Sequence, residues 1–174
     1  MVRRRYVQKN LWITQASLQL ALVVVLQGIT KPMGQLVTGS CVNMVLAMTV
    51  LIMGCSGGLT VALVSPIAAY LLGIAPQLVT VPGIMVGNSM FVLILSMLNR
   101  KPVWKRSLVV LGAAVAKFLV MYIVVVKVIC GFAANVLIKN GLLKEAMLTQ
   151  ITVMFAWPQL VTALIGGEIA VLIV

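Results

Sequence analysis

The sequence contains no histidine, and only two of its 174 residues are acidic, Glu145 and Glu168. Histidine is the commonest protein ligand of transition metals, so this composition predicts no dedicated metal site. No serine or cysteine stands beside a general base, and no G-x-x-x-x-G-K-[ST] phosphate-binding loop occurs. We therefore predict that the protein is not an enzyme and holds no cofactor.

Cysteine is also scarce, with Cys41, Cys55 and Cys130 far apart in the sequence. Three cysteines at these spacings form neither a disulfide framework nor a zinc motif. No small-x-small cleavage site follows the first apolar run, so we expect that run to be retained as a helix rather than removed as a signal peptide.

Charged residues make up only 9% of the chain, whereas 63% of it is hydrophobic and its mean hydropathy is +1.20. Water-soluble domains do not have this composition. Apolar runs of about 20 residues can cross a hydrocarbon layer of ~30 Å as helices. We predict an all-α integral membrane protein, a compact bundle of six transmembrane helices that forms a single domain over residues 1–174. The predicted helices cover residues 11–29, 36–53, 56–73, 82–98, 107–129 and 146–174.

The net charge of +11 comes from 13 basic residues, most of which lie at the ends of the apolar runs. Residues 3–9 and residues 100–106 each contain four of them, and an even number of intervening spans puts both clusters on one side. Cytoplasmic loops are enriched in lysine and arginine, which places both termini in the cytoplasm. The charge is thus explained by topology, and we expect no nucleic-acid partner. Fewer basic residues fall in or beside the predicted outer loops: Lys31, Lys127, Lys139 and Lys144.

Polar side chains inside the apolar runs are the candidate functional residues, because an unpaired polar group in hydrocarbon costs several kcal/mol. Asn43 lies in the second predicted helix, and Asn88 directly follows a GxxxG motif formed by Gly83 and Gly87 in the fourth. The glycines favour close packing of helices. Each asparagine is expected to bond a neighbouring helix or to contact a ligand, and the sequence does not decide between these roles.

Lys117 lies near the centre of the fifth predicted helix. A lysine at this depth costs about 3 kcal/mol on insertion scales, so it requires a partner. Glu168 is the one carboxylate within a predicted span, although its position nearer the inner face does not guarantee a pair. A pair with Glu168, a contact with a substrate, and extension of the side chain toward the inner face all fit the sequence.

The stretch MFAWPQLVTALIGGE, residues 154–168, is the most polar part of the sixth predicted helix. Pro158 predicts a break beside Trp157 and Gln159. Helical spacing places Gln159, Thr162 and Gly166 on one face and Glu168 on another. Trp157 is expected either to fill the core or to stack on a ring-shaped ligand.

Two further segments carry predictions. Ser17 and Ala21 form a small-x-x-x-small pair on the first helix, which allows a close contact either within the bundle or with a partner subunit. Residues 130–145 form the longest segment outside the predicted spans. We expect an outer loop there, with a short helix in FAANVLI.

The number of spans, the mass of 18.6 kDa and four stretches resemble the S component of energy-coupling factor (ECF) vitamin transporters. The stretches are the Ser17 to Ala21 pair, GCSGGLTVALVSPIAAYLLGI (54–74), PGIMVGN (82–88) and AWPQLVTALIGG (156–167). The resemblance covers nearly the whole chain. It implies a binding subunit in the cytoplasmic membrane of a prokaryote that captures a vitamin or cofactor precursor from outside.

The same resemblance implies partners and site residues. The subunit would dock through its first helix on a membrane-embedded coupling (T) subunit that two ATPase subunits drive. The family's usual alanine-x-x-x-alanine contact is Ser17-x-x-x-Ala21 here. The implied binding site uses the outer halves of the fourth, fifth and sixth helices and the three outer loops, with Asn43 of the second helix as a secondary candidate. The lack of histidine excludes the nickel and cobalt substrates of some relatives. These candidate residues are Asn43, Asn88, Lys117, Tyr122, Trp157 and Gln159.

Two other classes fit the composition. A standalone ion-coupled secondary carrier or a small channel would use Lys117 and Glu168 as its ion path. A membrane scaffold without transport activity is the third class. The chain has neither ATP chemistry nor a pair of central carboxylates, so accumulation of a substrate would require energy from a partner.

Overall fold

The computed structural model describes residues 2–74, 77–98 and 103–174, and this part of the chain is helical throughout apart from short connections. Short 3-10 helices are η1 (Lys31–Met33), η2 (Leu78–Thr80) and η5 (Glu145–Met147), and η4 (Tyr122–Phe132) is a π-helix. The described α-helices are α1 (Val2–Thr30), α2 (Gln35–Leu71), α3 (Val81–Leu95), α4 (Val103–Met121), α5 (Ala134–Lys139), α6 (Leu148–Met154) and α7 (Trp157–Ile173). The predicted all-α class is confirmed.

Four described helical stretches are long and apolar enough to cross a membrane: Gln8–Met33, Gln35–Leu71, Leu78–Leu95 and Lys105–Phe132. The pair Glu145–Met154 and Trp157–Ile173, bent by 42°, makes a fifth. Large apolar side chains are exposed along these helices, among them Leu18, Ile29 and Leu119. Apolar helices with apolar outer surfaces indicate a multi-pass membrane protein.

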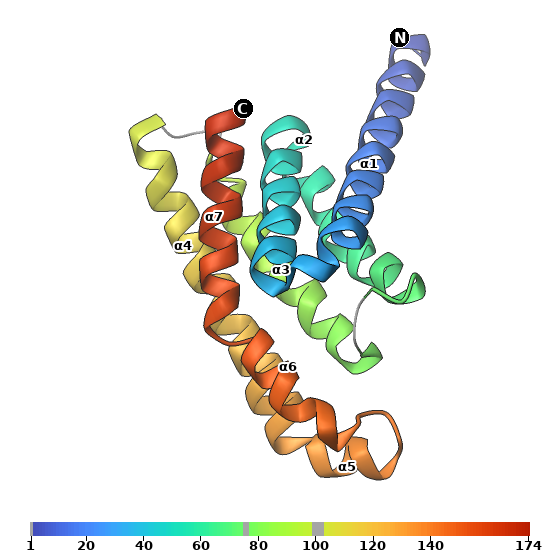
Figure 1. Cartoon of the computed structure of the whole chain (residues 1–174). Helices are drawn as coiled ribbons and strands as arrows, with labels where there is room; N and C mark the ends of the chain where they lie inside the picture. Colours follow the sequence, from blue (N-terminus) through green and yellow to red (C-terminus); the bar gives the residue numbers. More distant parts are fainter. Residues whose placement is uncertain (1, 75–76, 99–102) are drawn as a thin grey trace.

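Helices that the sequence predicts separately at 36–53 and 56–73 are continuous as α2, but Gly54 interrupts the helical geometry. Its φ of 75° and ψ of −168° lie in a region that glycine adopts without a steric penalty. Figure 1 shows the two halves of α2 leaving this point as the arms of a hairpin. The GCSGG sequence therefore makes a turn between the two predicted helices, with Gly54 as the residue of non-helical geometry within α2.

The chain folds into a bundle and a distal arm. Side chains of α1, α2, α3, α4 and α7 form the core of the bundle, with Leu46, Phe91 and Val110 fully buried. A second cluster, which includes Val125 and Ile151, holds the distal arm together. We define the distal arm as residues 122–154, and Figure 1 shows it extending beyond the bundle. It contains α5, which confirms the short helix expected in FAANVLI.

Both ends of the chain lie at the same end of the bundle in Figure 1, and so does the turn at Gly54. The first residues of α4, which include Lys105 and Arg106, also lie there. Arg100 and Lys101 of the predicted basic loop fall outside the described residues. The distal arm and η1 lie at the opposite end.

Glycines allow the helices of the bundle to approach closely, as the GxxxG motif predicts. A Cβ added to Gly87 would meet the Met121 side chain, and one added to Gly83 would lie 2.5 Å from Val125. Close packing of α3 on α4 and η4 is therefore confirmed. Gly166 packs in the same way on the backbone of α2. Ser17 and Ala21 lie exposed on α1.

The break predicted in the last span is present, two to three residues before the proline itself. Helix α6 ends at Met154 and α7 begins at Trp157, so Pro158 stands in the first turn of α7. A proline is tolerated there because the first N–H groups of a helix have no partner within it. The Gln159 amide nitrogen donates to the Met154 carbonyl oxygen at 3.0 Å, which satisfies one backbone group at the break.

We predict that Gly166→Ala lowers the free energy of unfolding by about 1 to 3 kcal/mol, because the added Cβ would meet the Ser40 carbonyl oxygen and lie 2.6 Å from the Met44 nitrogen. Gly112→Ala is the matched control, since nothing lies within 4 Å of its Cβ. Unfolding by SDS in mixed micelles, followed by circular dichroism, measures both. Equal stabilities of the two variants would show that α7 does not pack on α2 in this way.

Candidate functional site

A pocket of about 430 Å³ lies between the bundle and the base of the distal arm. Residues at the end of α1 and the beginning of α2 line it together with residues of α3, α4, α6 and α7. It therefore lies toward the end of the bundle opposite the chain termini (Figure 1). Its polar lining residues are Gln27, Lys31, Gln35, Thr38, Asn43, Asn88, Lys117, Gln150 and Gln159, and its apolar ones include Ile84, Met121, Met154 and Phe155.

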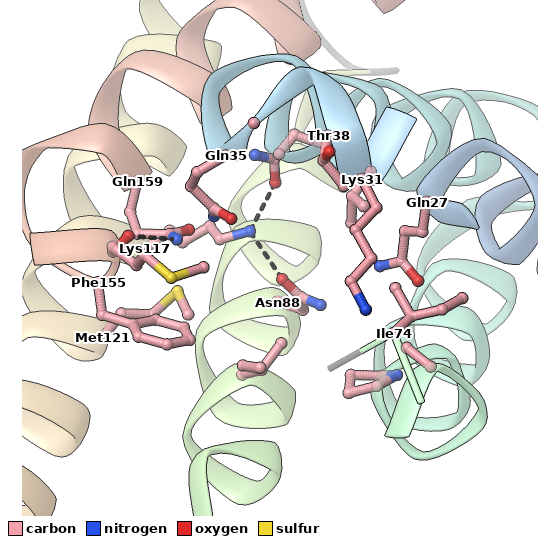
Figure 2. A pocket seen from close by; sticks show the side chains of 18 of the residues that line it. Gln27, Lys31, Gln35, Thr38, Ile74, Asn88, Lys117, Met121, Phe155 and Gln159 are labelled. Carbon is pink, nitrogen blue, oxygen red and sulfur yellow. Dashed lines mark hydrogen bonds between the residues drawn. The ribbon is translucent and has the colours of Figure 1, made fainter. Parts of the chain in front are cut away.

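Lys117 lies at the inner wall of this pocket with only 2% of its surface exposed. Its Nζ donates to Asn43 Oδ1 at 2.5 Å and to Asn88 Oδ1 at 2.7 Å, as Figure 2 shows. The ring of Phe91 lies 5.4 Å from Nζ, close enough for a cation–π interaction. Lys117 of α4 therefore forms hydrogen bonds to Asn43 of α2 and to Asn88 of α3, and these bonds link the three helices.

A second set of bonds fixes the orientation of the Asn43 amide. Asn43 Nδ2 donates to Thr162 Oγ1 at 3.2 Å, and the Thr162 hydroxyl donates to the Gln159 carbonyl oxygen at 3.3 Å. Since the amide nitrogen is directed to α7, the amide oxygen faces Lys117. The bond network therefore extends from α4 through α2 to α7.

The mouth of the pocket is formed by the residues that join α1 to α2. Lys31 Nζ donates to the Gly73 carbonyl oxygen at 2.8 Å, and the Thr38 hydroxyl donates to the Thr30 carbonyl oxygen at 2.9 Å. Gln27 Oε1 is buried and has no hydrogen-bond partner among the described residues. A buried acceptor without a partner is costly, and Figure 2 shows this oxygen on the side of the Gln27 amide away from Lys117 and Asn88.

Four of the six predicted binding residues line the pocket: Asn43, Asn88, Lys117 and Gln159. The interhelical hydrogen bonds expected for the two asparagines are confirmed. Tyr122 is half-buried at the start of η4, with its ring 5.9 Å from that of Phe118, and it does not line the pocket.

Trp157 lies outside the pocket, and 57% of its side chain is exposed. The expectation that Trp157 fills the core is therefore wrong. Its position at the first residue of α7, directly after the bend, turns the ring outward while the next two residues, Pro158 and Gln159, are buried. Stacking of Trp157 on a ligand in this pocket has no support from the geometry.

Lys117 and Glu168 take part in separate bonds. The Ser107 hydroxyl donates to Glu168 Oε2 at 3.0 Å, near the beginning of α4, whereas Lys117 bonds to the two asparagines. Lys117 does not extend toward the end of the bundle where the termini lie, because its Nζ is held inside the protein. The predicted separation of Glu168 from the face of Gln159 and Thr162 is confirmed.

Several lining residues were not singled out from the sequence: Gln27, Gln35, Thr38, Gln150 and, as a site residue, Lys31. Helical spacing was the available signal. Gln27 and Lys31 are four residues apart, and Gln35, Thr38 and Val42 repeat at three and four residues, so each set shares a face. Of these residues, only Lys31 and Gln35 fall between the predicted helices, whereas Gln27, Thr38 and Gln150 lie inside them.

Within residues 2–74, 77–98 and 103–174, no group of three histidine, cysteine, aspartate or glutamate residues could hold a metal ion. Cys41, Cys55 and Cys130 are free thiols. The polar side-chain groups of the pocket are amides, one hydroxyl and two ammonium groups. Such groups bind organic molecules through hydrogen bonds and charge.

No protein-family model, no curated protein and no solved structure matches the chain. The structure therefore defines the class of protein on its own, an all-helical chain with several long apolar helices.

We predict that Asn43→Ala lowers the free energy of unfolding by about 1 to 3 kcal/mol, because Lys117 loses an acceptor and Thr162 loses its donor. Asn135→Ala, on an exposed position of α5, is the control and should change stability by less than about 0.5 kcal/mol. SDS unfolding in mixed micelles compares the two. An unchanged free energy of unfolding in Asn43→Ala would mean that Lys117 has other partners.

Proposed function

We propose that the chain crosses the membrane six times, with both termini in the cytoplasm. The two arms of α2 on either side of Gly54 would be separate crossings, which adds one to the five spans counted by continuous apolar length. Support comes from the basic clusters at residues 3–9 and 100–106 and from the shared end of the bundle at which both termini lie (Figure 1). In this orientation the pocket opens toward the outside.

We propose that the protein, in that orientation, serves as the substrate-binding subunit of an ECF-type importer in a prokaryotic cytoplasmic membrane. It captures a vitamin-like small molecule from outside and releases it inward. The observation that carries this proposal is the 430 Å³ pocket with a buried lysine held by two asparagines on its wall. Pockets of about 300 to 1,000 Å³ with few polar groups among apolar side chains are typical of small-molecule sites.

The energy for uptake would come from a partner. We propose that a coupling subunit with two ATPases docks on α1, where Ser17 and Ala21 are exposed on one face. Ser17 also lines a groove of about 210 Å³ between α1 and the second arm of α2, beside Ala16 and Thr60. Small exposed residues allow a partner helix to approach closely.

A standalone carrier or channel is less well supported. It needs a path for ions between Lys117, which is buried, and Glu168, whose bond to Ser107 is exposed. Their bonds to different residues, two asparagines in one case and Ser107 in the other, favour separate roles. A membrane scaffold has no need for a pocket of this size.

Ser17→Leu and Ala21→Leu should each abolish co-purification with the coupling and ATPase subunits when all are expressed together, because leucine prevents close approach of a partner helix. Gly112→Leu places leucine on an exposed position of α4 and should leave the complex intact. A stable complex in both α1 variants would remove this face from the interface.

Native mass spectrometry of the purified protein should detect a retained small molecule. Asn88→Ala should weaken its binding by roughly 1 to 3 kcal/mol, since Asn88 lines the pocket and positions Lys117. Trp157→Ala should bind with wild-type affinity because the ring lies outside the pocket. A loss of affinity in Trp157→Ala together with wild-type affinity in Asn88→Ala would show that the ligand binds outside this pocket.

A further inference from the structure

The pocket carries positive charge without a compensating acid. Among the described residues, those that line it include Lys31 and Lys117 but no aspartate or glutamate. Glu168 bonds to Ser107, and Glu145 begins η5 on the distal arm. Both acidic residues of the chain are therefore placed outside the pocket.

The partners of Lys117 are neutral and do not use all its donors. An ammonium group has three N–H bonds, of which one goes to Asn43 Oδ1 and one to Asn88 Oδ1. A buried charge is costly unless it is paired with an opposite charge or fully hydrogen-bonded. Lys117 lines the pocket, so an anion bound there would supply both an acceptor for the remaining N–H and the missing charge.

Asn88 provides a second donor beside this one. Its Oδ1 accepts from Lys117, while its Nδ2 forms no hydrogen bond among the described residues. Figure 2 shows the Asn88 nitrogen directed away from Lys117, into the pocket on the side of Lys31. One ammonium N–H and one amide NH₂ on adjacent side chains match the two oxygens of a carboxylate.

We propose that the ligand of this pocket is a small carboxylic acid whose carboxylate binds Lys117 and Asn88. This inference rests on the proposed binding function and adds the chemical class of the substrate. The apolar body of the acid would lie against Met121, Met154 and Phe155. A phosphate dianion is a poor match because it brings three terminal oxygens and a second charge to the one buried ammonium.

The test uses the full chain in lipid nanodiscs. It is incubated with a protein-free bacterial cell extract supplemented with a defined mixture of carboxylic acids, their primary carboxamides and phosphate monoesters. After washing, retained molecules are identified by mass spectrometry. We expect a carboxylic acid to be enriched, and its affinity should fall roughly thirtyfold or more in Lys117→Met, because a hydrogen-bonded buried charge is lost.

Lys31→Met is the matched control, since it removes the other cation of the pocket at its exposed mouth and leaves Lys117 in place. Its loss of affinity should be at least tenfold smaller. Should Lys117→Met not purify as a single species, Lys117→Met/Asn88→Leu replaces it, because this pair also removes one acceptor that would be left unsatisfied.

The outcomes separate the two levels of the proposal. Enrichment of a carboxamide, a phosphate ester or a cation, or an acid retained equally by wild type and Lys117→Met, would overturn the carboxylate site while leaving a small-molecule binding protein. A wild-type protein that retains nothing from the extract or the mixture would overturn the binding function itself.

Discussion

The buried ammonium of Lys117 is the constraint on which the arrangement of the bundle depends. It draws Asn43 of α2 and Asn88 of α3 toward α4, and Asn43 in turn is bonded to Thr162 of α7. A polar group left without partners in an apolar bundle costs more than its bond contributes when formed, so these four helices have few alternative positions. The pocket borders this network and takes its polar wall from it.

Backbone irregularities make the network possible. Gly166 lets α7 approach α2 closely enough for Asn43 to reach Thr162. The bend between α6 and α7 then turns the distal arm away from the bundle, and Gln159 satisfies the Met154 carbonyl freed by the bend. The pocket lies beside this bend, since Met154, Phe155 and Gln159 line it.

The sequence predicted the elements of the fold well, because long apolar runs, the glycines at 54–58 and Pro158 act locally. It did not predict the π-helix η4, since its apolar residues differ little in pattern from an α-helix. The sequence offers Glu168 as the one acidic partner for Lys117 within a predicted span. In the structure, two neutral side-chain amides accept the hydrogen bonds of Lys117 instead. Spacing places Gln27 and Thr38 on helix faces shared with other lining residues, but it does not give the direction of those faces. Packing sets the rotation of each helix, and it turns these residues inward and Trp157 outward.

We propose that the wall around Lys117 faces a bound organic anion. Cryo-electron microscopy of the protein purified with its retained molecule, bound to a fiducial antibody fragment, tests it most directly. We predict ligand density within hydrogen-bonding distance of Lys117 Nζ and Asn88 Nδ2, with the two asparagine oxygens still on Lys117. A pocket filled by repacked side chains or by a lipid acyl chain, or a ligand bound elsewhere on the chain, would contradict the claim.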